Sequence, residues 1–194
     1  MPSQSSPSLS QTVALRFATA LSTQSDTEKA ATELADEMQA KFGPAPIDLA
    51  CLFFSAHHSV RADVLAATIS RSLCPRFLIG CSGEGIIAGA EELESAPAVT
   101  LWAASLPDVT IDPIQASFSP TRDQFRLSDW PDFKGEDASL LLLADPFTTP
   151  VQEVLSLLDD RYPGVKAIGG LAGGGHGVGE NRLIFDNEVL TGGL

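Results

Sequence analysis

Two stretches of the chain repeat one pattern. Residues 77–85 (FLIGCSGEG) and 167–175 (AIGGLAGGG) each follow an apolar run with Ile-Gly and a loop of glycines and small residues. The segments that end in this Ile-Gly, 47–80 and 137–169, also correspond: each has an apolar run, an amphipathic stretch and a proline. Apolar runs on both sides of a helical stretch are typical of parallel strands covered on both faces. The repeat therefore predicts an α/β fold with two related βαβ units.

The helical and strand periodicities extend this prediction along the chain. The helix at 25–43 should begin at Ser25 or Asp26 and end at Gly43. The second helix should bury an apolar face made by Val60, Val64, Leu65, Ile69 and Leu73. Strands are expected over 12–22, 47–56, 76–82, 138–147 and 165–172, and helices over 25–43, 60–73 and 150–162.

The segment between the two units has a different character. Apolar runs at 85–93, 98–106 and 109–118, joined by short turns, predict an antiparallel meander. Residues 119–137 read as an irregular excursion, and 181–194 as a hairpin that turns at 186–188. The expected fold is therefore α/β: a mixed β-sheet with two related βαβ units, helices packed on the sheet and an antiparallel meander between the units.

We expect residues 1–10 to be a disordered tail and 11–194 to form one domain. The last strand-like run stops at Leu194. A sheet rarely ends on an uncovered apolar strand, so we expect a domain truncated before a C-terminal half, and an exposed edge that favours homo-oligomers.

Composition excludes several functions. The net charge is −13, and Lys and Arg form no cluster, which argues against nucleic acid and anionic membrane surfaces as partners. The N-terminus has no signal-peptide pattern, no apolar run could span a bilayer, and three cysteines make no complete disulfide set. We therefore expect a cytoplasmic protein.

The glycine loops do not match the known nucleotide-binding motifs. GCSGEG differs from GxGxxG, and GGLAGGGHG lacks the Lys-Ser/Thr of a phosphate loop, so no cofactor is expected.

Polar residues and glycines gather where the parallel strands should end. Ligands of such sheets bind beyond the carboxyl ends of the strands, and glycines there let backbone N–H groups approach a carboxylate closely. The alternative is that these glycines serve only tight turns. The candidate ligand-binding residues are Ser55, His57, Cys81, Ser82, Gly83, Glu84, Gly85, Asp145, Phe147, Gly169, Gly170, Gly173 and Gly174.

Two of these residues allow other interpretations. Cys81 stands between a strand and a glycine turn, where a nucleophile could be presented, with His57, His58 or His176 as its base. A buried free cysteine is also common as a small hydrophobe, and no spacing supports a metal site. Asp145 could meet an ammonium group or simply begin a turn before Pro146.

The chain resembles the FIST family, a domain of bacterial signal-transduction proteins that also occurs with F-box proteins. The resemblance rests on DLACLFFSAHH, FLIGCSGEGIIAG, AVTLWAASLP, LLLLADPF, AIGGLAGGG and LIFDNEVLTGG, in this order over about residues 12–194. It implies a sensory domain that binds a small ligand, with amino acids the usual suggestion. The resemblance is to the N-terminal half of the family domain, and it carries over no catalytic residue.

The sequence leaves three functions open. The first is a small-ligand-binding sensory domain in intracellular signalling, with an amino acid or similar small carboxylate as ligand. The second is an enzyme that uses Cys81 as nucleophile. The third is a scaffold or adaptor module that binds a signalling protein partner.

Overall fold

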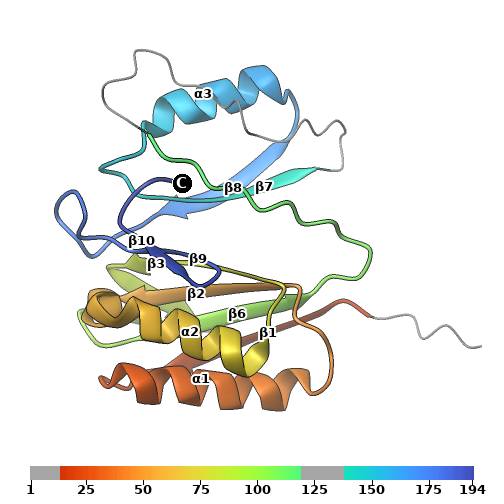
Figure 1. Ribbon diagram of the computed structural model, residues 1–194, viewed down its shortest axis with the longest axis vertical. Coiled ribbons are helices and arrows are strands. Elements are labelled where there is room, and N and C mark those ends of the chain that lie inside the picture. Colours follow the sequence, from red (N-terminus) through yellow and green to blue (C-terminus); the bar gives the residue numbers. More distant parts are fainter. Residues whose placement is uncertain (1–13, 119–137) are drawn as a thin grey trace, which may run out of the picture.

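The computed structural model describes residues 14–118 and 138–194, and their fold is layered (Figure 1). Helices α1 (Thr27–Phe42) and α2 (Ala62–Leu73) cover one face of a six-stranded mixed sheet. A two-stranded sheet of β7 (Ser139–Ala144) and β8 (Lys166–Leu171) lies toward the other face, and α3 (Val151–Arg161) lies beyond it. The predicted α/β class, with helices packed on a mixed sheet, is confirmed. The expected tail at 1–10 and the excursion at 119–137 lie outside the described residues.

The six-stranded sheet has the order β1-β6-β2-β3-β9-β10. Its strands β2 and β3 are parallel, and every other neighbouring pair is antiparallel. The hairpin of β9 and β10 turns after Phe185, as expected, with Asp186 at φ 53°. The strands are β1 (Arg16–Ser22), β2 (Leu49–Ser55), β3 (Phe77–Gly83), β6 (Val99–Ser105), β9 (Leu183–Phe185) and β10 (Glu188–Leu190).

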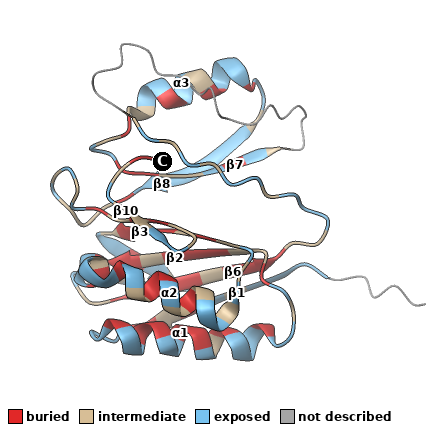
Figure 2. Ribbon diagram, viewed as in Figure 1, coloured by how far each residue is buried: buried red, intermediate tan, exposed pale blue. Residues whose placement is uncertain are grey.

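The main hydrophobic core lies between this sheet and the two helices (Figure 2). Alternate residues of β2, including Leu52 and Phe54, face the helices and are fully buried. Helix α1 begins where the Asp26 side chain accepts a hydrogen bond from the Lys29 N–H at 3.0 Å, and it ends at Gly43, whose φ is 57°. These are the start and stop signals that the sequence predicts.

The two βαβ units are equivalent around one glycine each. Gly80 is the fourth residue of β3 and pairs with Leu52, and Gly169 is the fourth residue of β8 and pairs with Leu142. A Cβ at Gly80 would lie 2.0 Å from the Leu52 carbonyl oxygen, and one at Gly169 would lie 1.8 Å from that of Leu142. The glycine of each Ile-Gly therefore marks a point where a side chain would prevent the second strand of the unit from approaching the backbone of the first strand so closely. Both strand pairs are parallel, as predicted, but both glycines lie inside strands and not at their ends.

The connections differ from the sequence prediction in three respects. The second unit forms its own two-stranded sheet and does not join the six-stranded one. The expected meander is broken: 85–93 folds into a separate hairpin of β4 (Gly85–Ala88) and β5 (Glu91–Glu94), whereas β6 inserts between β1 and β2. Residues 109–118 form no strand. Local periodicity indicates that a segment is extended, but it does not specify which strand the segment pairs with, and this is the physical reason for these errors.

Burial also departs from expectation in two elements. All six residues of β8 are exposed, with Ile168 at 72%, although its sequence predicts a strand covered on both faces (Figure 2). β8 pairs only with β7 among the described strands, so one of its edges has no strand beside it. Val60 is 88% exposed because the chain around it forms a 3₁₀ helix, η1 (Ala56–Arg61), before α2 begins.

The glycine equivalence predicts a matched effect of substitution. Gly80→Ala and Gly169→Ala should each lower the free energy of unfolding by about 1–3 kcal/mol, because the added methyl group overlaps a backbone carbonyl. Gly170→Ala is the matched control, since a Cβ there meets nothing within 4 Å, and it should change stability by less than about 0.5 kcal/mol. Chemical denaturation measures all three. Equal effects at Gly169 and Gly170 would contradict the close approach.

Candidate functional site

The two glycine loops lie against each other at the carboxyl ends of β3 and β8. The Gly173 N–H donates a hydrogen bond to the Ser82 carbonyl at 2.9 Å. Gly174 has a φ of 86°, and a Cβ on it would lie 3.1 Å from the Gly83 carbonyl oxygen and 3.2 Å from the Ala56 Cβ. The structure therefore brings together the loops that the sequence pairs by their likeness, and part of their hydrogen-bonding capacity is used in this joint.

Two serines at the strand ends are buried and bonded within the protein. The Ser82 hydroxyl accepts the Arg182 N–H at 3.1 Å, and the Ser82 N–H donates to the Arg182 carbonyl at 2.9 Å. The Ser55 hydroxyl accepts the Ala98 N–H at 3.0 Å and lies 3.3 Å from Nδ1 of His57. The serines thus hold the strand ends in place, and His57 stands exposed beside Ser55.

Asp145 lies fully buried at the end of β7. Its Oδ1 accepts a hydrogen bond from the Asn181 amide at 2.9 Å, and its Oδ2 accepts one from the Thr148 hydroxyl at 2.7 Å. The Asn181 Oδ1 in turn accepts the Gly175 N–H at 2.9 Å. Asp145 therefore connects β7 to the second glycine loop through Asn181. Sequence reasoning missed Asn181, because a single polar residue before an apolar strand carries no spacing signal.

The remaining candidate residues are more open. Glu84 and Gly85 are exposed at the first loop, and Gly83, Gly173 and Gly174 are partly buried. Phe147 is 44% exposed in the turn after β7. Gly169 and Gly170 lie within β8, before the loop, and line an apolar pocket beneath α3. The backbone and the Glu84 carboxylate thus offer the accessible polar groups at this joint.

The three cysteines fall into two environments. Burial raises the pKa of Cys81 to about 12, and burial together with the neighbouring Cys81 raises the pKa of Cys51 to about 12. Cys81 packs with Ala172 and Leu183 in a small apolar cluster, whereas Cys74 is exposed. At neutral pH Cys81 is a protonated thiol in apolar surroundings, which is unfavourable for a nucleophile.

His58 is the one histidine that is buried. Its Nδ1 lies 2.9 Å from the Thr27 hydroxyl in the first turn of α1, and its Nε2 has no hydrogen-bond partner among the described residues. Loss of solvation, helped by the nearby His57, lowers the pKa of His58. The neutral imidazole is therefore the form that fits this position.

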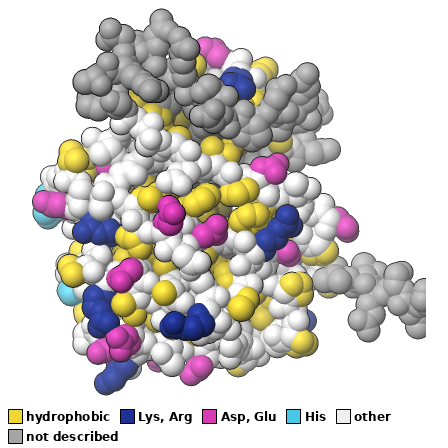
Figure 3. All heavy atoms as spheres, in the orientation of Figure 1, with side chains coloured by type: hydrophobic (Ala, Val, Ile, Leu, Met, Phe, Trp, Pro, Cys, Tyr) yellow, Lys and Arg dark blue, Asp and Glu magenta, His cyan; other side chains and the backbone are white. Residues whose placement is uncertain are grey.

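The described residues contain neither a metal-binding cluster nor a helix that could span a membrane. Across 14–118 and 138–194, no three His, Cys, Asp or Glu side chains gather in a way that could hold a metal ion. None of the helices in these ranges is long and apolar enough to cross a bilayer. On the face in Figure 3, charged side chains of both signs are scattered among hydrophobic ones, without one large basic patch.

One family model and several curated proteins match the chain. The family model described as the FIST N domain matches residues 48–194. The chain is 33% identical over 180 residues to uncharacterized protein Rv0628c of Mycobacterium tuberculosis, and 32% identical over 181 residues to uncharacterized protein Mb0898c of Mycobacterium bovis. Each match covers 93% of this chain and 46% of the relative, so the chain spans about half the length of these curated relatives. No solved structure matches it significantly.

The buried His58 predicts a pH dependence of stability. Its pKa is depressed in the folded state, so its contribution should be complete above the unfolded-state value of about 6.5 and should fall as the pH drops below that. His58→Gln should weaken the loss of Tm between pH 7.5 and 5.5, measured by thermal melts. His176→Gln, at an exposed histidine, is the control. An unchanged pH dependence in His58→Gln would contradict this assignment.

The cysteine environments predict an order of labelling. A thiol reagent should modify Cys74 first, because it is exposed, and should reach Cys51 and Cys81 only through opening of the fold. Mass spectrometry of partly labelled protein, with Cys74→Ser as the control, measures the order. Labelling of Cys81 at the rate of Cys74 or faster would favour the enzyme hypothesis.

Proposed function

The chain belongs to the FIST family, and we propose that it binds an amino acid or similar small carboxylate where its two glycine loops meet. FIST domains are a family of sensory domains in signal transduction. The proposal adds to this a ligand class and a place. Its main support is the contact between Gly83 and Gly174 at the carboxyl ends of parallel strands, the position where ligands of such sheets bind.

The carboxylate of the ligand is assigned to the backbone of the loops. Successive N–H groups in glycine-rich turns form concave sites for anions, and absent side chains permit close approach. The N–H groups of Ser82 and Gly173 already donate within the protein. Gly83 pairs with Ser55 of β2, and Gly85 pairs with Glu94 of β5, so we assign the carboxylate to the N–H groups of Glu84 and Gly174. His57 stands at the same strand end as a further donor, 3.3 Å from the Ser55 hydroxyl.

The ammonium group of the ligand is assigned to Glu84. Asp145 was the other candidate, but it is fully buried and its two oxygens accept hydrogen bonds from Asn181 and Thr148. Glu84 is exposed and stands within the first loop. A carboxylate there would bind the ammonium group of an amino acid and would contribute nothing to the binding of an organic acid that lacks this group.

The test is a thermal-shift screen that compares amino acids with the matching acids that lack the amino group. Ligand at 100 times its Kd should stabilise the fold by about 2.7 kcal/mol, a Tm shift of about 5–10 °C for a chain of this size. Glu84→Gln should reduce the shift for amino acids and spare it for the acids. Glu91→Gln, at an exposed glutamate of β5, is the control. No shift with any member of either series would refute the proposal.

The two alternatives stand differently against the structure. The raised pKa and burial of Cys81 count against a nucleophilic role, so we place the chain among binding domains. The exposed strand β8, with Ile168 at 72% and Leu171 at 51%, supports a protein partner or a homo-oligomer in addition to a ligand. We propose a cytoplasmic location for this signalling role.

A further inference from the structure

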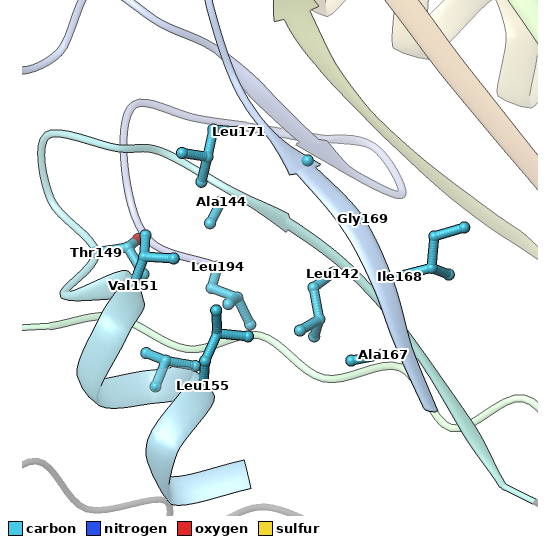
Figure 4. A pocket seen from close by; sticks show the side chains of 12 residues that line it. Leu142, Ala144, Thr149, Val151, Leu155, Ala167, Ile168, Gly169, Leu171 and Leu194 are labelled. Atoms are coloured by element: carbon cyan, nitrogen blue, oxygen red, sulfur yellow. The ribbon is translucent and has the colours of Figure 1, made fainter. Parts of the chain in front are cut away.

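A cavity of about 220 Å³ lies between α3 and one face of the β7–β8 sheet (Figure 4). Side chains of α3, including Val151 and Leu155, form one wall, and Leu142 and Ala167 belong to the opposite wall. The described residues that line it are Leu142, Ala144, Thr149, Val151, Val154, Leu155, Ala167, Ile168, Gly169, Gly170, Leu171 and Leu194.

The cavity follows from the glycine that the strand pairing requires. Helix α3 packs on β7 through Val154 and Leu158, which form a cluster with Leu140. On β8 the residue that faces α3 between Ala167 and Leu171 is Gly169, and a Cβ there would overlap the Leu142 carbonyl. Because no side chain can fill this position, the space beneath α3 stays open on the β8 side.

The lining of the cavity is almost entirely apolar. Among the described lining residues, Thr149 alone has a polar side chain, and its hydroxyl donates to the Gly193 carbonyl at 2.8 Å. Ala144 and Val154 are buried at 4% and 1%, whereas Leu155 and Leu171 are exposed at 40% and 51%. The cavity thus has a closed apolar part and an exposed apolar rim, and the contact of this rim with water is unfavourable.

We propose that this cavity binds the alkyl chain of a small amphiphile, with the polar end of the molecule left in solvent at the rim. An apolar cavity of about 150 Å³ is already large enough for benzene, and this one is larger and open at one side. None of the described residues that line it has a charged side chain, so the polar end finds no charged partner among them. The site is distinct from the proposed glycine-loop site, because none of residues 82–85 or 173–175 lines the cavity.

A series of straight-chain alcohols from n-butanol to n-decanol tests the proposal. These probes carry neither a carboxylate nor an ammonium group, so they do not report on the glycine loops. Affinity should rise about fourfold for each added methylene until the cavity is full, and then level off. Methyl NMR shifts should move at Val151, Leu155, Leu171 and Leu194. Absence of the length dependence, or shifts that spare these methyl groups, would overturn the proposal.

Two matched variants of β8 locate the binding. Ala167→Phe places a ring in the cavity from an exposed position and should reduce the affinity for n-hexanol at least tenfold. Lys166→Phe adds the same kind of ring on the same strand, but Lys166 is exposed and is not among the lining residues, so the affinity should be retained. Equal loss in both variants, or none in Ala167→Phe, would refute the site. Glu84→Gln should leave alcohol binding unchanged, which separates this result from the outcome at the glycine loops.

Discussion

The backbone contact between the two glycine loops is the interaction on which the arrangement of the layers depends. The hydrogen bond from the Gly173 N–H to the Ser82 carbonyl and the approach of Gly174 to Gly83 join the β7–β8 unit to the six-stranded sheet. Among the described residues, a small apolar cluster around Cys81 packs beside this joint, whereas the main core lies on the other side of the sheet. A Cβ on Gly174 would lie 3.1 Å from the Gly83 carbonyl oxygen, so the two loops would have to move apart slightly, whereas a Cβ on Gly173 would meet the Glu84 nitrogen at an ordinary 3.4 Å.

This joint also explains why a sensory role suits the fold. The hydrogen bonds of Asn181 to Asp145 and of Gly175 to Asn181 connect the second loop to the end of β7. On the proposed function, a ligand at the loops would contact residues from both layers, so its binding energy would depend on how the layers are arranged. A ligand shifts a conformational equilibrium only through such differential contacts. An alkyl chain under α3 would act on the outer layer alone.

Much of the local structure could be predicted from particular residues. The repeated pattern that ends in Ile-Gly correctly predicted that β2 pairs with β3 and that β7 pairs with β8. Asp26 and Gly43 correctly predicted the two ends of α1. The insertion of β6 between β1 and β2, and the separation of the β4–β5 hairpin, were missed. An apolar run of seven residues fits an edge or a central position equally well, because strand propensity reflects its eventual neighbours. The buried link through Asn181 was missed for the same reason, since its partners lie far along the chain.

Sequence reasoning was sufficient to predict two βαβ units, an Ile-Gly in the second strand of each, and a glycine loop after each. These are consequences of backbone sterics within short segments: Gly80 and Gly169 face carbonyl groups of strands that precede them by one helix. Three features became clear only from the complete fold: the units lie in different sheets, their loops contact each other, and β8 is exposed. Those outcomes depend on which apolar faces pack together, often between segments far apart in the chain. The hydrophobic effect is non-directional, so a short segment of sequence does not specify its packing partner.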